Sequence, residues 1–170
     1  MVLKERARWR LVIAVIIALA APGAQARAQD SGIEVGSKAP AAAVETLDGQ
    51  PAELSSVFGK RPVVIQFWAT WCPTCKAMEP AMLAAQQKYA GKVTFVGVAV
   101  SVNQSPRAVQ AYAAKHAPTM TQFFDRRGKA VAAYEVPATG FLVIVNKAGQ
   151  VVYTGLGAQQ DIDAAINKVL

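Results

Sequence analysis

The chain has 170 residues, 53% of them hydrophobic, and a formal net charge of +7. That length is enough for one domain with a single core. The basic residues do not cluster with aromatic residues, so we expect no nucleic-acid partner. Two cysteines and one histidine are too few for a structural zinc site, which commonly takes four such ligands.

The N-terminal segment has the three parts of a secretory signal peptide. Met1–Arg10 carries four basic residues, Leu11–Ala21 is an uncharged apolar run, and the small residues Ala26 and Ala28 suit a cleavage site. The apolar run is shorter than the roughly 20 residues that span a bilayer, so an uncleaved membrane anchor is the less favoured alternative. Cleavage of residues 1–28 would remove five basic residues and one acidic residue, which lowers the net charge from +7 to +3. We therefore predict a periplasmic protein whose mature domain is residues 29–170.

Short elements precede the first buried strand. Residues 29–43 contain Gly, Ser, Pro and Ala and predict an irregular segment. Residues 44–54 predict a β-hairpin that turns at Asp48-Gly49, a strong turn signal. A short helical turn is expected at 54–58. The run Val63–Trp68 is β-branched and aromatic, which is typical of a buried strand.

Both cysteines of the chain follow that strand, in the segment Trp71-Cys72-Pro73-Thr74-Cys75. The residues after it, up to about Ala90, favour a helix that Pro80 should kink. Cys72 suits the N-cap and Pro73 the first helical position, where the missing N–H of proline costs nothing. A sulfur at a helix N-terminus faces unpaired N–H groups, which favours the thiolate. Because a disulfide across two residues closes almost no loop and adds little stability, we interpret the pair as a redox site.

The rest of the chain alternates strands and helices. The predicted elements are a strand at 93–100, a helix that begins at Ser105-Pro106, a short strand or loop at 119–124, a short helix at 129–134, a hairpin of 141–145 with 151–154, and a final helix at 162–169. This order predicts an α/β fold in which helices flank a mixed central β-sheet.

The segment Phe67–Cys75, followed by Pro80 and by Val136-Pro137 ahead of an apolar strand, resembles the thioredoxin superfamily. The pieces Gly36–Pro40 and Asp48-Gly49 are similar to the opening of its exported TlpA/ResA-like thiol–disulfide oxidoreductases. The similarity covers essentially all of residues 33–170. The resemblance implies a thioredoxin fold with an N-terminal β-hairpin extension. We expect a monomer without a cofactor or a metal.

The resemblance also assigns a role to Val136 and Pro137. The superfamily keeps a cis-proline that faces the cysteine pair, and Pro137 matches that position. Val136 would then offer its backbone N–H and C=O to an extended client segment. A cis peptide bond is rare outside proline, so this role requires proline.

Two positions depart from the family pattern. Thioredoxin itself has a buried acid where Gln66 stands, and many TlpA/ResA-like proteins have Glu where Met78 stands. An acid beneath the cysteines helps to move the proton of the buried thiol. Glu79 lies about 100° around the helix from Met78, so we expect a solvent-facing residue there, with a catalytic role as the alternative. His116 is expected to be a solvated residue in the last turn of its helix.

The predicted activity is the reduction of disulfides in periplasmic client proteins. Exposed Cys72 attacks a client disulfide to form a mixed disulfide, and buried Cys75 then attacks Cys72 and releases the reduced client. A membrane electron-transfer protein is the expected re-reductant. We expect the client to contact an apolar patch made of Trp71, Pro73, Thr74, Val136 and Pro137.

Three alternatives give the same residues other roles. A strongly stabilised thiolate would make the protein an oxidant that forms disulfides. A copper(I) carrier would use soft sulfur ligands, which lie close to one helix face, from Cys72, Cys75, Met78 and Met82. The segment Cys72-Pro73-Thr74 also resembles peroxiredoxins. Ala69 stands where that family has Thr, however, and a second cysteine is foreign to its pattern, so we do not expect antioxidant activity.

Overall fold

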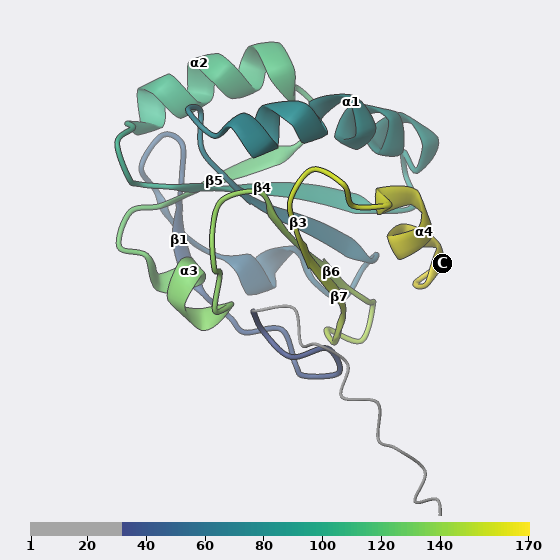
Figure 1. Cartoon of the computed structure of the whole chain (residues 1–170). Coiled ribbons are helices and arrows are strands. Elements are labelled where there is room, and N and C mark those ends of the chain that lie inside the picture. Colours follow the sequence, from purple (N-terminus) through teal and green to yellow (C-terminus); the bar gives the residue numbers. More distant parts are fainter. Residues whose placement is uncertain (1–31) are drawn as a thin grey trace, which may run out of the picture.

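The computed structural model describes residues 32–170, so the predicted signal peptide lies outside the described residues. Seven strands form one mixed sheet in the order β2-β1-β5-β4-β3-β6-β7 (Figure 1). β3, β4 and β5 run parallel, and the outer strands pair antiparallel. The strands are β1 (Ala43–Thr46), β2 (Pro51–Glu53), β3 (Val63–Trp68), β4 (Thr94–Val100), β5 (Thr121–Asp125), β6 (Phe141–Val145) and β7 (Val151–Leu156).

Helices cover both faces of the sheet. They are α1 (Pro73–Lys88), α2 (Pro106–His116), α3 (Lys129–Ala133) and α4 (Ile162–Asn167), with a 3-10 helix at Leu54–Val57. α1 and α2 lie on one face and α3 on the other (Figure 1). α4 packs into the same core cluster as α1. The mixed sheet with flanking helices confirms the predicted thioredoxin fold.

The six residues of β3 are all buried, and they divide between the two faces because side chains alternate along a strand. Val63, Ile65 and Phe67 belong to the core beneath α3. Val64 packs against α1 and α4, and Trp68 packs beside the cysteines. Continuous burial is what a central strand of an α/β sheet requires.

The N-terminal β-hairpin is confirmed. β1 and β2 pair antiparallel, and Gly49 has a positive φ of 89°. That conformation suits glycine, because it lacks a Cβ. β1 also pairs with β5. This pairing explains why residues 121–125 form a strand, whereas the sequence alone did not distinguish a strand from a loop there.

Several boundaries differ from the predictions by one or two residues, among them those of β7 and α4. β7 extends to Leu156 rather than Thr154, because its pairing with β6 continues to the partners Phe141 and Leu156. α4 ends at Asn167 and not Val169. Among residues 32–170, no helix has the length and apolar character to cross a membrane.

Candidate active site

The cysteine pair lies where β3 ends and α1 begins. Cys72 and Cys75 form a disulfide with an S–S distance of 2.12 Å. Cys72 is the N-cap of α1, and its Sγ accepts a hydrogen bond from the N–H of Cys75 at 3.0 Å. Pro73 opens the helix. The predicted capping geometry is confirmed, and it provides a backbone donor that stabilises a Cys72 thiolate.

The burial of Cys72 corrects the prediction that its sulfur is exposed. In the disulfide-bonded state Cys72 is 1% exposed and Cys75 is 4% exposed. Both pack in one cluster with residues of β3, β4, β5 and α2, among them Trp68, Val109 and Phe124. The tight turn into the helix therefore holds the sulfurs within the apolar layer between sheet and helices.

Exposed apolar side chains surround the buried pair. Trp71 is 43% exposed, and Pro73 is also exposed. The indole N–H of Trp71 donates a hydrogen bond of 2.8 Å to the C=O of Val102, and Val102 is itself 57% exposed. Val102 was not among the predicted contact residues, because a single valine in a polar loop gives no sequence signal. Its position next to Trp71 follows only from the tertiary fold.

The loop from α3 to β6 differs from the expectation for Val136 and Pro137. Residues 32–170 contain no cis peptide bond, so Pro137 is not a cis-proline here. The N–H of Val136 donates to the C=O of Val131 at 3.0 Å, so it is not available to a client strand. This bond closes the turn after α3, and Val136 packs against the core on that side. Pro137 is exposed.

Gly140 is the residue of this loop that approaches the cysteine turn. A Cβ added at Gly140 would lie 2.7 Å from Cγ2 of Thr74, and φ of Gly140 is +87°. Its N–H donates to the C=O of Phe67 at 2.8 Å. Both the close approach and the backbone conformation therefore require glycine.

Gln160, in the loop between β7 and α4, holds Gly140 in place. Its Nε2 donates to the C=O of Gly157 at 2.7 Å and to that of Gly140 at 3.3 Å. Its Oε1 accepts from the hydroxyl of Tyr153 at 3.1 Å. Gln160 was not among the predicted site residues, because an isolated glutamine near a helix start has no distinctive pattern.

A row of polar residues crosses the sheet beneath Cys75. Gln66 on β3 pairs in register with Gly97 on β4, which pairs with Gln122 on β5. The indole N–H of Trp68 donates to Oε1 of Gln122 at 3.1 Å. A Cβ at Gly97 would lie 2.1 Å from that oxygen. Glycine is therefore needed for the hydrogen bond to pass over β4.

The prediction that Glu79 and His116 face solvent holds only in part, because their side chains are 28% and 32% exposed and also contact each other. One oxygen of Glu79 accepts a hydrogen bond from the hydroxyl of Tyr112, and the other lies 3.1 Å from Nδ1 of His116. The rings of Tyr112 and His116 are stacked, with centroids 4.2 Å apart. Burial, followed by the hydrogen bond and the charge of Glu79, raises the pKa of Tyr112 to about 12. The tyrosine therefore remains a hydrogen-bond donor over the physiological pH range.

These groups enclose a small cavity. It measures about 30 Å³ and is lined by nine residues, namely Gln66, Trp68, Cys75, Glu79, Tyr112, His116, Ala117, Met120 and Gln122. Cys75 thus shares a cavity with a carboxylate, although neither of the positions where the family places an acid carries one.

The structure does not bring the four proposed copper ligands together. Met78 and Met82 are buried in the core between α1 and α4, whereas Cys72 and Cys75 belong to a different cluster. The nitrogen of Gln160 lies 4.0 Å from Sδ of Met78. Both methionines thus serve in packing. Residues 32–170 also contain no group of three or more His, Cys, Asp or Glu side chains arranged to hold a metal ion.

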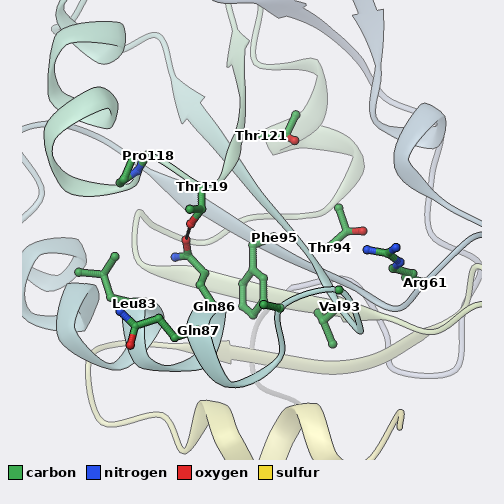
Figure 2. A pocket seen from close by; sticks show the side chains of 12 residues that line it. Arg61, Leu83, Gln86, Gln87, Val93, Thr94, Phe95, Pro118, Thr119 and Thr121 are labelled. Atoms are coloured by element: carbon green, nitrogen blue, oxygen red, sulfur yellow. Dashed lines mark hydrogen bonds between the residues drawn. The ribbon is translucent and has the colours of Figure 1, made fainter.

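A larger cavity, of about 550 Å³, lies at the opposite end of the parallel strands (Figure 2). Its lining includes Thr94 and Thr121, at the starts of β4 and β5, and Gln86 on α1. Gln86 accepts a hydrogen bond from the hydroxyl of Thr119 (Figure 2). No cysteine lines this cavity, so the redox chemistry belongs to the other end.

Comparison with known proteins supports a thiol–disulfide chemistry. The family model described as Redoxin matches residues 34–170. The chain is 32% identical to "Thiol-disulfide oxidoreductase ResA" of Bacillus subtilis over 129 residues, which are 76% of this chain and 71% of ResA. It is 36% identical to "Thioredoxin-like protein YneN" of the same species over 101 residues. That match covers 59% of this chain and 59% of YneN, so the chain spans about three fifths of this relative.

A solved structure of a disulfide oxidoreductase is similar to this chain in both sequence and fold. It is described as a secreted Mycobacterium tuberculosis disulfide oxidoreductase homologous to E. coli DsbE. It is 29% identical to this chain and superposes with a TM-score of 0.62, covering 75% of this chain and 92% of that one.

Proposed function

Since this chain belongs to the redoxin family and is a thiol–disulfide oxidoreductase of the TlpA/ResA-like kind, we propose that it reduces disulfide bonds of client proteins outside the cytoplasm. The observation that carries the proposal is the Cys72–Cys75 disulfide at the N-terminus of α1. The hydrogen bond from the N–H of Cys75 to Sγ of Cys72 favours the thiolate needed for attack.

The reaction exchanges one disulfide for another. In the reduced protein the Cys72 thiolate attacks one sulfur of the client disulfide, which forms a mixed disulfide and releases the first client thiolate. Cys75 then loses its proton and attacks Sγ of Cys72, which releases the second client thiolate. Two electrons pass from the cysteine pair to the client, and the pair ends as the disulfide of this structure.

The client has to reach a sulfur that is buried in the oxidised protein. The exposed side chains of Trp71, Pro73 and Val102, with Thr74 beside them, provide apolar area next to Cys72. A client protein bound to this apolar area would have its disulfide next to Cys72. We include the exposed side chain of Pro137 in this contact patch. The N–H of Val136 already donates to Val131 and is not free to bind the client.

Extracytoplasmic location is also part of the proposal. The sequence of residues 1–28 has the features of a signal peptide, and one structural relative is described as secreted. We propose a membrane electron-transfer protein as the re-reductant. Cell fractionation and N-terminal sequencing of the processed chain test the location. An unprocessed protein found with the cytoplasmic fraction would contradict it.

A disulfide-reduction assay with insulin tests the activity. We expect Cys72→Ser to lose the activity completely and Cys75→Ser to accumulate a covalent complex with the client, because the second attack is then missing. Identification of proteins trapped by Cys75→Ser in extracts of the exported fraction names the clients. Full activity of Cys72→Ser would refute the assigned nucleophile.

The direction of the reaction is decided by the reduction potential. A redox titration against glutathione should give a value near that of thioredoxin, about −270 mV, for a reductase. A value near about −120 mV would indicate the alternative, an oxidant that forms disulfides.

A further inference from the structure

We propose that Glu79, paired with His116, takes up the proton that Cys75 must lose in the second step, through a water molecule held in the cavity that these residues line. The inference rests on the proposed dithiol chemistry and concerns this chain's own proton path. Cys75 is 4% exposed, and burial in apolar surroundings disfavours the thiolate. Direct loss of its proton to bulk solvent is therefore hindered, and an internal acceptor is needed.

The lining of the cavity identifies the acceptor. β3 and β5 contribute neutral side chains, those of Gln66, Trp68 and Gln122. The titratable groups in the lining are Cys75 itself, Glu79, Tyr112 and His116. Tyr112 stays protonated because its pKa is raised to about 12. This leaves the Glu79–His116 pair, whose groups lie 3.1 Å apart. Of the two, Glu79 lies on the same helix as Cys75, one turn further along α1.

The cavity has the size and the polarity to hold one water molecule. Its volume of about 30 Å³ exceeds the roughly 10–15 Å³ that a water requires. Nε2 of Gln122 is buried and has no hydrogen-bond partner among the described residues. A buried donor without a partner costs about 1–3 kcal/mol. A water in the cavity would accept from this amide and would connect the thiol of Cys75 with Glu79.

His116 connects Glu79 with solvent and can carry the proton out of the cavity. Its Nδ1 lies 3.1 Å from Oε2 of Glu79, and its side chain is 32% exposed, against 28% for that of Glu79. Stacking on Tyr112 fixes the orientation of the imidazole ring. The hydroxyl of Tyr112 fixes the carboxylate from the other side. A proton that reaches the Glu79–His116 pair can therefore leave to solvent at the surface of α2.

Protons and electrons are conserved in this second step. The S–H bond of Cys75 breaks, and its proton moves through the water to the Glu79–His116 pair. The electron pair left on sulfur forms the bond to Sγ of Cys72, and the mixed disulfide breaks with its electrons on the client thiolate. No other oxidant or reductant is required.

Stopped-flow reaction of the reduced protein with an aromatic disulfide that releases a coloured thiolate separates the two steps. The first release reports attack by Cys72 and depends on reagent concentration. The second release reports attack by Cys75 and does not. We expect Glu79→Gln to slow the second phase about a hundredfold at pH 7, the lower end of what a positioned general base contributes, and to leave the first phase unchanged.

Control variants distinguish proton transfer from a structural effect. Glu45→Gln removes a carboxylate that pairs with Arg126 at 2.7 Å on the distant β1, and both of its phases should match those of the wild type. His116→Gln should slow the second phase by about tenfold and change its pH profile. Gln66→Glu combined with Glu79→Gln returns a carboxylate to the same cavity, and it should recover at least about tenfold of the lost rate.

A second phase in both Glu79→Gln and His116→Gln that stays within about twofold of the wild-type rate across the pH range would overturn the inference. Loss of the first phase from the wild-type protein would instead overturn the proposed function, and with it this proton path.

Discussion

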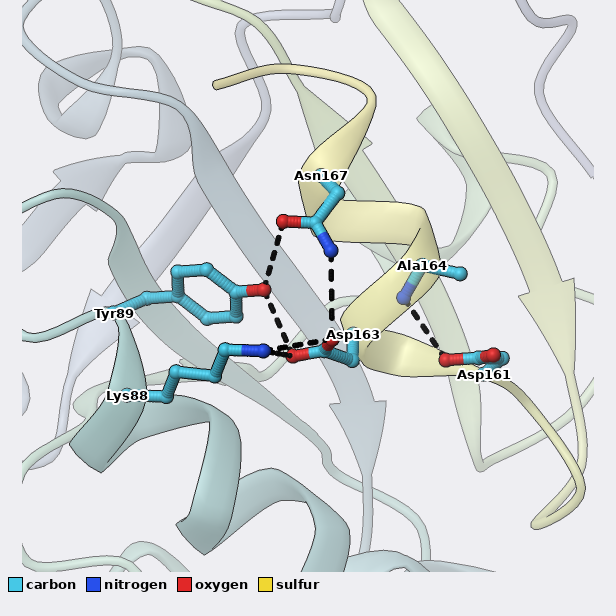
Figure 3. Close-up of polar contacts among 6 residues, drawn as sticks. All are labelled: Lys88, Tyr89, Asp161, Asp163, Ala164 and Asn167. Atoms are coloured by element: carbon cyan, nitrogen blue, oxygen red, sulfur yellow. Dashed lines mark hydrogen bonds and ion pairs between the residues drawn. The ribbon is translucent and has the colours of Figure 1, made fainter.

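The two ends of α1 each join a carboxylate to a tyrosine from different helices, but they do so in different surroundings. At the C-terminal end, Asp163 of α4 accepts hydrogen bonds from Nζ of Lys88 at 2.7 Å and from the hydroxyl of Tyr89 at 2.8 Å (Figure 3). Asn167 completes this group (Figure 3). At the N-terminal end, Glu79 meets Tyr112 and His116 of α2 beside the small cavity.

The polar groups at the C-terminal end satisfy one another at the surface. The hydrogen bond from Lys88, with that from Tyr89, lowers the pKa of Asp163, and the same contact with Asp163 raises the pKa of Lys88. The side chains of Lys88 and Asp163 are 57% and 49% exposed, so solvent screens their interaction. These hydrogen bonds connect α4 to the C-terminal end of α1.

The cluster around Glu79 differs from the other cluster because it borders a cavity that Cys75 also lines. Nε2 of Gln122, which belongs to the same lining, has no hydrogen-bond partner among the described residues. The two carboxylates therefore differ in their surroundings: the side chain of Glu79 is 28% exposed and lines a cavity with Cys75, whereas that of Asp163 is 49% exposed and pairs with Lys88. Four predictions test the contrast, in order of expected effect.

The largest effect is expected from substitution of the glycines near the two ends. Gly140 and Gly91 both have positive φ, +87° and +74°, but only Gly140 has an atom closer than 3 Å to an added Cβ. We expect Gly140→Ala to lower the free energy of unfolding by about 3 kcal/mol, from backbone strain and overpacking. Gly91→Ala should cost about 1 kcal/mol.

Urea denaturation measures both variants. Combination of Gly140→Ala with Thr74→Ser removes the methyl group that lies 2.7 Å away and should restore part of the loss. Equal costs for the two glycines would show that the contact with Thr74 does not constrain the loop.

Removal of the two tyrosine hydroxyls should give the next largest difference. Tyr112→Phe takes a donor from the partly buried Glu79, and we expect a loss of about 1–2 kcal/mol in the free energy of unfolding. Tyr89→Phe should cost less than half as much, since Asp163 keeps its bonds to Lys88 and Asn167. A larger loss in Tyr89→Phe would reverse the comparison.

Alkaline pH should weaken the N-terminal cluster. The pKa of Tyr112 is raised to about 12 from an ordinary value of 10, with burial as the main cause. The neutral hydroxyl therefore stabilises the folded state fully below pH 10, and this contribution is lost as the pH rises toward 12. The pKa of Tyr134 is also raised by burial.

Denaturation midpoints measured between pH 9 and 12 check this prediction. The wild-type midpoint should fall over this range, and Tyr112→Phe should show a shallower fall, with Tyr134 providing the remainder. An identical slope in the two proteins would argue against a desolvated Tyr112.

The smallest effect is expected at the ion pair of the C-terminal end. Lys88→Ala removes the partner of Asp163, but exposed ion pairs contribute little and are screened by salt. The denaturation midpoint of Lys88→Ala should fall slightly below the wild-type value at low ionic strength and should equal it at about 1 M salt. A difference between the two midpoints that persists in high salt would mean that the contact of Lys88 with Asp163 contributes more than a screened surface ion pair.

The elements themselves were largely predictable from local sequence. Val63–Trp68 forms the strand that its β-branched run predicts, and Cys72 and Pro73 occupy the expected cap and first helical position. Residues 121–125 were ambiguous, because their strand depends on pairing with β1 and β4, which lie far away in the sequence. The signal peptide and the domain limits drawn from it stay predictions.

The site was only partly predictable. Helical periodicity placed Glu79 away from Met78, but it did not reveal that α2 covers that side of α1. The exposure of Cys72, the cis bond at Pro137 and the free N–H of Val136 were wrong for this structure. Each of these depends on how the turn and the loop pack against the sheet.

The amino-acid sequence by itself determined the chemistry of the protein: two cysteines at a helix start, a proline between them, and an α/β order of elements. These features are local, since capping, helix initiation and strand propensity act over a few residues. Only the tertiary structure decided which neighbours the buried sulfur has. Sheet register aligned Gln66, Gly97 and Gln122, and helix packing brought Glu79 to His116, because contacts between distant residues depend on the geometry of the whole fold.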